Sequence, residues 1–276
     1  AGDSLSGERR EVVHRALEAA GLVVDPGAPA IIDLRIGARA PGEVAREVAH
    51  EYYEMDLDAG GARLRAAAWP GLLWGVRSLA QLVGQGRRGD PLPVLHIRDW
   101  PALAHRGIFV EDKWGPDRMG LEDWRRAVDR LAALKLNRLG VGLYGCWGSC
   151  RYELGPSGQG WPTEFLMVPV PGYPQLRTPK RLRWYSPAAA AWRDATYLPR
   201  LAAEDFLAAL VQYAAAAGVT VIPFVNSLGH NTFIPRVLPD IAAKEATGRS
   251  ASIGYCLSNP ATRAFLESFY SGIVER

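Results

Sequence analysis

Three pairs of adjacent carboxylates are the residues of this sequence best suited to acid–base chemistry. Glu111-Asp112 ends a short apolar stretch, whereas Glu122-Asp123 and Glu204-Asp205 stand where helices are expected to begin. Acidic side chains at a helix start are favoured by the helix dipole, so the last two pairs have a structural explanation. Glu111-Asp112 stands at the end of a predicted strand instead, so the helix dipole does not account for this pair.

A metal site is the second chemistry to consider, because Cys146 and Cys150 are close in the sequence. Only Cys256 and His230 could complete a set of four ligands, and structural zinc normally uses two closely spaced ligand pairs. The chain has 3 cysteines, and an odd number does not indicate a disulfide framework. The sequence therefore predicts no metal and no cofactor, with thiols that are buried or lie in loops.

Residues 1–98 alternate helix and strand patterns, which indicates a small α/β domain. An apolar helical stripe stops at Gly21, and a second one opens at Pro70, residues that end and begin helices well. Strands are predicted over residues 30–36, 52–58 and 62–68, the last two joined by a glycine-rich turn that is typical of a hairpin. We expect a compact sheet covered by two helices.

From residue 99 onward the pattern changes to short apolar strands that are each followed by a helix. Strands are predicted over residues 106–111, 139–143 and 219–225, and the last helix is expected to be capped by Asn259-Pro260. Alternation of hydrophobic strands with helices predicts a parallel sheet that is buried on both faces.

The connection between residues 144 and 201 has little periodicity but is rich in aromatic side chains. These are Trp147, Trp161, Tyr173, Trp184, Tyr185, Trp192 and Tyr197. Disordered segments are poor in aromatics, and unstructured loops longer than about 15 residues are uncommon unless they have a function. We therefore expect an ordered, functional connection. The basic run Arg177, Lys180, Arg181 and Arg183 within it is interpreted as a solvated face.

The composition is that of an ordinary globular chain, with 48% hydrophobic and 22% charged residues. The net charge is only +3, from 32 basic and 29 acidic side chains, which gives no reason to expect nucleic acid or an anionic membrane as partner. No stretch approaches the roughly 20 apolar residues that span a bilayer. The charged, helical N-terminus does not resemble a signal peptide. We expect a soluble chain, with compartment and oligomeric state left open.

Several motifs in order resemble glycoside hydrolase family 20, the β-N-acetylhexosaminidases. Residues 53–83 (YEMDLDAGGARLRAAAWPGLLWGVRSLAQLV) resemble the family's N-terminal domain. Residues 97–107 are similar to its entry into a catalytic barrel, and Lys135-Leu136-Asn137 to its approach to the second strand. Residues 221–230 and 257–260 resemble the third strand and the stretch after it. Order and spacing make these individually weak motifs moderately specific.

The resemblance implies a small α+β domain over residues 1–98, followed by a partial TIM (β/α) barrel over residues 99–276. It also implies cleavage of terminal N-acetylhexosamine from a glycan, with the sugar's own acetamido carbonyl as nucleophile. An adjacent Asp-Glu pair at the end of strand four would orient the acetamide and act as acid and base. No Asp-Glu dipeptide occurs in the sequence. We therefore expect the pair beyond Arg276, and no activity from this fragment alone.

The resemblance further implies residues that contact the substrate. They are Arg106, Glu111, Asp112, Asn226 and His230, and the aromatic connection adds Trp147 as a sugar-stacking residue. Arg106 would bind sugar hydroxyls and His230 would join a hydrogen-bond network, both at or near the carboxyl face of the barrel, where this fold builds active sites. Trp184 and Tyr185 are further candidates for stacking on a sugar. Alternatively, Arg106 pairs with a nearby carboxylate for structure only, and His230 caps a turn.

Departures from the family pattern leave other functions open. Trp114 stands in place of an arginine, Glu111 and Asn226 in place of aspartates, and Gly140, Gly142, Gly145 and Cys146 in place of histidines and aspartates. These changes indicate a divergent branch with a different substrate. One alternative is a non-catalytic carbohydrate-binding protein on a hydrolase fold. Another is a different barrel hydrolase with an N-terminal α/β domain, which acts on uronic acids or acetylated glycans.

Overall fold

The computed structural model describes most of the chain and divides it into two compact units. The described residues are 7–25, 27–86, 92–110, 119–143, 148–151, 160–163, 166–186, 189–198, 200–226, 228–229 and 233–276. Unit 1 comprises Ala1–Gly107, Ala127–Arg138 and Tyr213–Thr220, and unit 2 comprises Ile108–Arg126, Leu139–Gln212 and Val221–Arg276. Among the described residues, no helix combines the length and apolar character needed to cross a bilayer.

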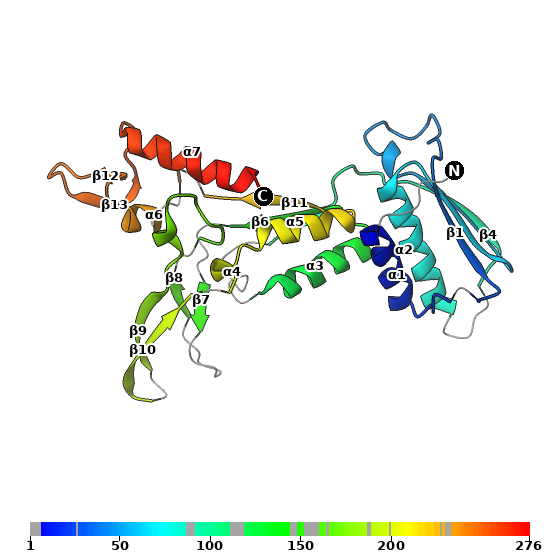
Figure 1. The fold of residues 1–276 in the computed structure, drawn as a ribbon, viewed down its shortest axis with the longest axis horizontal. Coiled ribbons are helices and arrows are strands. Elements are labelled where there is room, and N and C mark those ends of the chain that lie inside the picture. Colours follow the sequence, from blue (N-terminus) through cyan, green and yellow to red (C-terminus); the bar gives the residue numbers. More distant parts are fainter. Residues whose placement is uncertain are drawn as a thin grey trace. The chain divides into compact units, whose positions relative to one another are not determined.

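Unit 1 contains a four-stranded sheet with two helices on one face (Figure 1). The strands are β1 (Ile31–Ile36), β2 (Tyr53–Asp58), β3 (Gly61–Ala66) and β4 (Leu95–Asp99), and the helices are α1 (Gly7–Ala19) and α2 (Trp69–Gly86), with the short 3-10 helix η1 (Ala49–Glu51) before β2. The order is β1-β3-β2-β4, with β1 parallel to β3 and the other pairs antiparallel. The predicted sheet with two covering helices is confirmed. Strand β4 was not predicted as a strand.

The core of unit 1 lies between α2 and the inward face of the sheet. Met55, Leu57 and Leu64 alternate with polar neighbours and are at most 5% exposed. At Gly75 a Cβ atom would lie 2.1 Å from Leu64 Cδ2 and 3.0 Å from the Tyr53 ring, so only glycine allows α2 to approach the sheet this closely. Gly21, just past α1, has a φ of 77°, in agreement with its predicted role as a helix stop.

A second sheet holds β5 (Gly107–Val110), β6 (Arg138–Gly142) and β11 (Thr220–Phe224) in the order β11-β6-β5. The strands are parallel: Thr220 N donates to Asn137 O at 3.0 Å where β6 begins, and Leu143 N donates to Phe224 O at 2.8 Å where it ends. Helix α3 (Leu121–Ala133) precedes β6, and α5 (Leu207–Ala216) precedes β11. The predicted parallel strand–helix alternation is thus confirmed. Within the described ranges the sheet does not close into a barrel.

The aromatic connection between residues 144 and 201 contains paired strands. Its elements are β7 (Gly148–Arg151), β8 (Gly160–Thr163), the 3-10 helix η3 (Pro174–Arg177), β9 (Lys180–Ser186), β10 (Ala191–Tyr197) and α4 (Arg200–Ala203). β7 pairs with β8 and β9 with β10, both antiparallel. Two-stranded ribbons need not bury one face on a core, so their sequences lack the alternation by which strands are found.

The last elements of unit 2 are α6 (Phe233–Val237), β12 (Ala242–Lys244), β13 (Ser250–Tyr255) and α7 (Pro260–Val274). The predicted cap of α7 is confirmed, because the Asn259 side chain accepts a hydrogen bond from Ala261 N at 3.0 Å. Phe265 of α7 is fully buried and meets the Tyr173 ring edge-on, with centroids 5.0 Å apart. Helix α7 therefore packs on the segment that leads into η3.

Candidate functional site

Two of the six predicted substrate-binding residues, Arg106 and Asn226, are among the described residues. Glu111, Asp112, Trp147 and His230 lie outside them. Asn226 is half-buried and follows Phe224, the last residue of β11, by two positions. It therefore lies beyond the carboxyl end of a strand of the parallel sheet, which is the kind of position that the sequence predicts for it.

Arg106 lies at the amino end of the sheet, before β5 begins at Gly107. Its backbone carbonyl accepts hydrogen bonds from Asn137 N at 2.7 Å and Arg138 N at 3.0 Å, where β6 begins. Parallel strands have their amino ends at one edge and their carboxyl ends at the other. The expectation that Arg106 lies at the carboxyl face is therefore wrong, because the residue precedes its strand instead of ending it.

The Arg106 side chain is held by groups of unit 1. Its Nη2 donates to Glu51 Oε2 at 2.5 Å, its Nε to the Lys135 carbonyl at 3.0 Å, and its Nη1 to the Leu103 carbonyl at 2.6 Å. The guanidinium also lies 6.0 Å from the centroid of the Trp74 ring. The side chains of Arg106 and Glu51 are 15% and 2% exposed. This geometry matches the structural alternative for Arg106, a pair with a nearby carboxylate.

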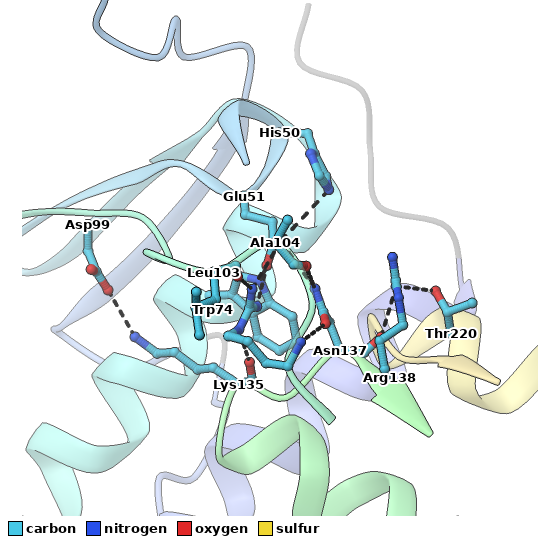
Figure 2. Close-up of polar contacts among 11 residues, drawn as sticks. His50, Glu51, Trp74, Asp99, Leu103, Ala104, Lys135, Asn137, Arg138 and Thr220 are labelled. Carbon is cyan, nitrogen blue, oxygen red and sulfur yellow. Dashed lines mark hydrogen bonds and ion pairs between the residues drawn. The ribbon is translucent and has the colours of Figure 1, made fainter. Parts of the chain in front are cut away.

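Glu51 joins three other side chains in what we term the Glu51 cluster: Glu51, Trp74, Arg106 and Asn137. Besides Arg106, its carboxylate accepts from Trp74 Nε1 at 2.6 Å and from Asn137 Nδ2 at 3.3 Å. The Asn137 side chain in turn accepts from Arg106 N at 2.9 Å. Figure 2 shows Trp74 and Asn137 pointing toward Glu51 from α2 and from the start of β6. The cluster thus ties the beginnings of two strands to α2.

Lys135 lies beside this cluster and forms a second set of polar contacts. Its Nζ donates to Ser78 Oγ at 2.7 Å, Asp99 Oδ2 at 3.1 Å and the Tyr53 hydroxyl at 3.2 Å. Burial, together with the charge of Asp99, raises the pKa of Tyr53 above its usual range. A cavity of about 200 Å³ is lined by Lys135 and Asp99 together with residues of the Glu51 cluster.

The chemistry that this part of unit 1 can perform is limited by its internal pairing. Arg106 is paired with Glu51 and Lys135 with Asp99, so these four ionisable groups have their counter-charges within the cavity wall. In the described part of the chain, no three His, Cys, Asp or Glu side chains are grouped to hold a metal ion. The arrangement is suited to fixing strand starts, and the Glu51 cluster is a positioning device.

Sequence reasoning missed Glu51 and gave Lys135 no role. Glu51 and Arg106 are 55 residues apart in the chain, and no local pattern signals a contact at that separation. Lys135 and Asn137 belong to the Lys135-Leu136-Asn137 motif, which resembles the family's approach to its second strand. This resemblance was the available sign that the two residues have a role.

An aromatic pair lies on the β9–β10 ribbon of unit 2. Tyr185 and Trp192 are register partners, and their rings meet edge to face with centroids 5.8 Å apart. They are 44% and 61% exposed. Tyr185 was predicted as a stacking candidate, and it does present its ring to the surface. Trp184 lies in β9, but its side chain is outside the described set.

Comparisons with known proteins all match glycoside hydrolases of one kind, the β-hexosaminidases. The family model for glycosyl hydrolase family 20, domain 2, matches residues 3–100. A β-hexosaminidase of Akkermansia muciniphila is 28% identical over 231 residues, which cover 79% of this chain and 41% of that protein. The structure of the β-N-acetylhexosaminidase of Bacteroides fragilis matches with a TM-score of 0.64 and 14% identity, over 99% of this chain and 49% of that one.

A second solved structure with a similar fold is the exo β-N-acetylglucosaminidase of Vibrio harveyi in complex with N-acetylglucosamine. It matches with a TM-score of 0.59 and 13% identity, over 98% of this chain and 40% of that one. The chain spans 41% of the Akkermansia protein, so it matches less than half of that relative. The chain is thus similar to β-hexosaminidases of glycoside hydrolase family 20, and its residues 3–100 match the family's domain 2.

Proposed function

We propose that this chain is part of a glycoside hydrolase that releases terminal N-acetylhexosamine by substrate-assisted cleavage. The observation that carries the proposal is the similarity to the Akkermansia β-hexosaminidase over 231 residues. The domain 2 match accounts only for residues 3–100, so this similarity extends far into the strand–helix region beyond it. The relative from Vibrio harveyi, whose structure contains N-acetylglucosamine, supports the same class of substrate.

The proposed fold for residues 99–276 is the opening part of a TIM barrel. The parallel strands β5, β6 and β11, with helices between them, support this architecture. Phe109 and Phe224 on the outer strands are 52% and 47% exposed, although parallel sheets are normally covered on both faces. Further strands and helices of a complete barrel would cover these rings.

The proposed substrate-binding residues follow the carboxyl ends of these strands. In the sequence, Glu111 and Asp112 come directly after β5, Trp147 comes after β6, and Asn226 and His230 come after β11. Loops at the carboxyl ends of barrel strands build the active sites of this fold. Arg106 is left out of the set, because its place before β5 and its contacts with Glu51 give it a positioning role.

The proposed acid–base pair is an Asp-Glu dipeptide in residues that follow Arg276. No such dipeptide occurs in the 276 residues, and the chain covers 41% of the Akkermansia protein. The aspartate would orient the sugar's acetamido group. The carbonyl oxygen of that acetamido group would then attack the anomeric carbon. The glutamate would protonate the leaving oxygen and then take a proton from the water that opens the cyclic intermediate.

A pair of chromogenic substrates tests the proposal on the natural protein that carries this chain. We expect hydrolysis of 4-nitrophenyl N-acetyl-β-glucosaminide and at least about a hundredfold slower hydrolysis of the matched β-glucoside, which lacks the acetamido nucleophile. Equal rates on the two substrates would contradict substrate assistance. Asn226→Ala should lower kcat/KM about tenfold or more, whereas Arg63→Gln, on the exposed face of β3, should leave it unchanged.

A non-catalytic carbohydrate-binding protein is the second candidate, and the exposed pair Tyr185 and Trp192 favours it. Aromatic faces at a surface are suited to stacking on sugar rings. In this case the natural protein would bind N-acetylhexosamine-containing glycans without hydrolysing either chromogenic substrate. Binding would then weaken in Trp192→Ala.

A further inference from the structure

The face of the unit 1 sheet that is turned away from α1 and α2 carries charged side chains in two cross-strand rows. One row is Asp33, Arg63, Asp56 and His96, in the strand order β1, β3, β2, β4. The other row is Arg35, Arg65, Glu54 and Arg98 in the same order. The inward residues Met55 and Leu64 alternate with these positions and are fully buried, so the charges are confined to the open face.

The two rows differ in how their charges are arranged. In the first row the acidic and basic groups alternate, and His96 contacts Asp56 at 2.7 Å. In the second row Arg35 and Arg65 are direct register partners. Like charges directly opposite each other on adjacent strands are destabilising. The second row therefore contains a local excess of positive charge that the alternation of the first row avoids.

A hollow of about 480 Å³ lies at this excess of charge. Its lining includes the guanidinium-bearing residues Arg35, Arg39 and Arg65, with residues 36–38 as the adjoining wall and Glu54 as the acidic member. Residue 37 is a glycine with a φ of 125°, a conformation that side-chain-bearing residues rarely adopt. The turn that places Arg39 beside the two strand arginines therefore depends on Gly37.

Two of the hollow's arginines form no ion pair with the acidic groups beside them, although Glu54 is the register partner of Arg65. Asp33 pairs with Arg35 at 2.8 Å. Glu54 accepts a hydrogen bond from the Tyr52 hydroxyl. Among the described residues, Arg39 and Arg65 form no ion pair and no side-chain hydrogen bond, and both are exposed. Two guanidinium groups that form no ion pair and line one hollow are suited to binding an anion of matching size.

We propose that this hollow binds the sulfate or carboxylate group of an acidic saccharide. Guanidinium groups match both anions, because their N–H donors form parallel pairs of hydrogen bonds to two oxygens. The inference that a saccharide carries the anion rests on the proposed function, whereas the anion preference rests on the arginines alone. An anion held between Arg35, Arg39 and Arg65 would also remove the repulsion between the adjacent strand positions.

Calorimetric titration of the full chain at fixed ionic strength tests the proposal with four ligands: N-acetylglucosamine 6-sulfate, glucuronic acid, N-acetylglucosamine and sodium sulfate. We expect at least one acidic sugar to bind at least about tenfold more tightly than N-acetylglucosamine and than sulfate ion. Arg65→Gln should weaken this binding about tenfold or more. The affinity should also fall as salt is added, because the site is exposed.

Arg63→Gln is the matched control, since Arg63 lies on the same face of the same strand but pairs with Asp58 at 2.6 Å and does not line the hollow. The affinity of this variant for the acidic sugar should stay within about twofold of that of the unmodified chain. Equal binding of neutral and acidic sugars, or equal losses in Arg63→Gln and Arg65→Gln, would overturn the anion site. Sulfate ion binding as tightly as the sulfated sugar would overturn the saccharide assignment.

The outcome is independent of the hydrolysis assay. Arg65-dependent binding of an acidic sugar, together with no hydrolysis of either chromogenic substrate, would keep the anion site and remove the proposed catalytic function. Hydrolysis without any preference for acidic sugars would keep the proposed catalytic function and remove the anion site. Thermal unfolding of Arg65→Gln at low salt verifies that this variant is folded, and loss of one member of a like-charge pair should not lower its midpoint.

Discussion

At the scale of single residues, the ion pair between Glu51 and Arg106 indicates that Arg106 has a structural role. The Glu51 side chain is 2% exposed, and three side chains donate hydrogen bonds to its carboxylate. A buried pair of this kind is costly to break, because the remaining charge has neither water nor a partner. The pair therefore helps to fix the beginnings of the strands, and its removal should lower the free energy of unfolding.

Glu51→Gln tests this role directly. The change leaves the Arg106 guanidinium largely enclosed without its counter-charge, so we expect the free energy of unfolding to fall by about 3–5 kcal/mol. Urea denaturation measures the difference. Glu43→Gln is the control, since Glu43 pairs with Arg98 at 3.3 Å at a well-exposed position, and its removal should cost less than about 1 kcal/mol. Similar losses in the two variants would show that Glu51 has no special structural role.

The candidate site could be predicted from the sequence only in part. Asn226 was expected beyond the end of a strand, and the structure places it there. Arg106 was misplaced because its position at the carboxyl face was inferred from the family resemblance, although the strand predicted over residues 106–111 already begins with this arginine. Its partner Glu51 could not be found, because the contact depends on how α2 and η1 pack in three dimensions.

At the scale of elements, the end of α3 carries a lysine where a glycine is usual. Leu136 N donates to Leu131 O at 2.9 Å and Lys135 N to Ala132 O at 3.0 Å, which is the Schellman pattern with Lys135 at the left-handed position. Lys135 has a φ of 56°. Its ammonium group contacts Asp99, Ser78 and Tyr53, and these contacts compensate for the unfavourable backbone conformation.

Two substitutions separate the backbone effect from the side-chain effect at this position. Lys135→Gly and Lys135→Ala both remove the ammonium group, but only alanine keeps a Cβ atom in the left-handed conformation. We expect the glycine variant to be more stable than the alanine variant by about 1 kcal/mol. Thermal or urea unfolding of both proteins measures this difference. An alanine variant of equal or greater stability would mean that α3 does not end in this way.

Gly140 in β6 lets aromatic rings from the two flanking strands meet above it. A Cβ atom there would lie 2.9 Å from the rings of both Phe109 and Phe224, whose centroids are 4.6 Å apart. We expect Gly140→Ala to lower the free energy of unfolding by about 1–3 kcal/mol, because the rings must separate. Gly84→Ala in α2 is the control, since open space surrounds Gly84 and alanine is favoured in a helix. An equally stable Gly140→Ala would contradict the close packing.

Elements with a one-sided hydrophobic pattern and clear end signals could be predicted from the sequence. Helix α7 has both, with Asn259 as its cap and Phe265 and Phe269 on its buried side. Strand β4 is short, with Leu95 and Ile97 as its inward residues, and the β12–β13 pair lacks such a pattern. Their residues become strands because a neighbouring strand supplies hydrogen bonds, as β2 does for β4. Information of this kind is non-local, and a periodicity within one segment cannot contain it.

At the scale of the whole molecule, the chain joins a domain 2 match over residues 3–100 to a strand–helix region with three parallel strands. The boundary predicted at residue 98 stays a prediction, and unit 1 also takes in Ala127–Arg138 and Tyr213–Thr220. The sheet remains open within the described residues. The proposed barrel, with the acid–base pair in residues beyond Arg276, would complete the proposed sugar-cleaving enzyme on these units.

The most direct test of this account compares the 276-residue chain with the natural protein that carries it, on 4-nitrophenyl N-acetyl-β-glucosaminide. Each protein is first shown to be folded by its thermal unfolding transition. The account predicts steady release of nitrophenol by the natural protein and none above background by the chain, which contains no Asp-Glu pair. Turnover by the chain at a rate similar to that of the natural protein would contradict it.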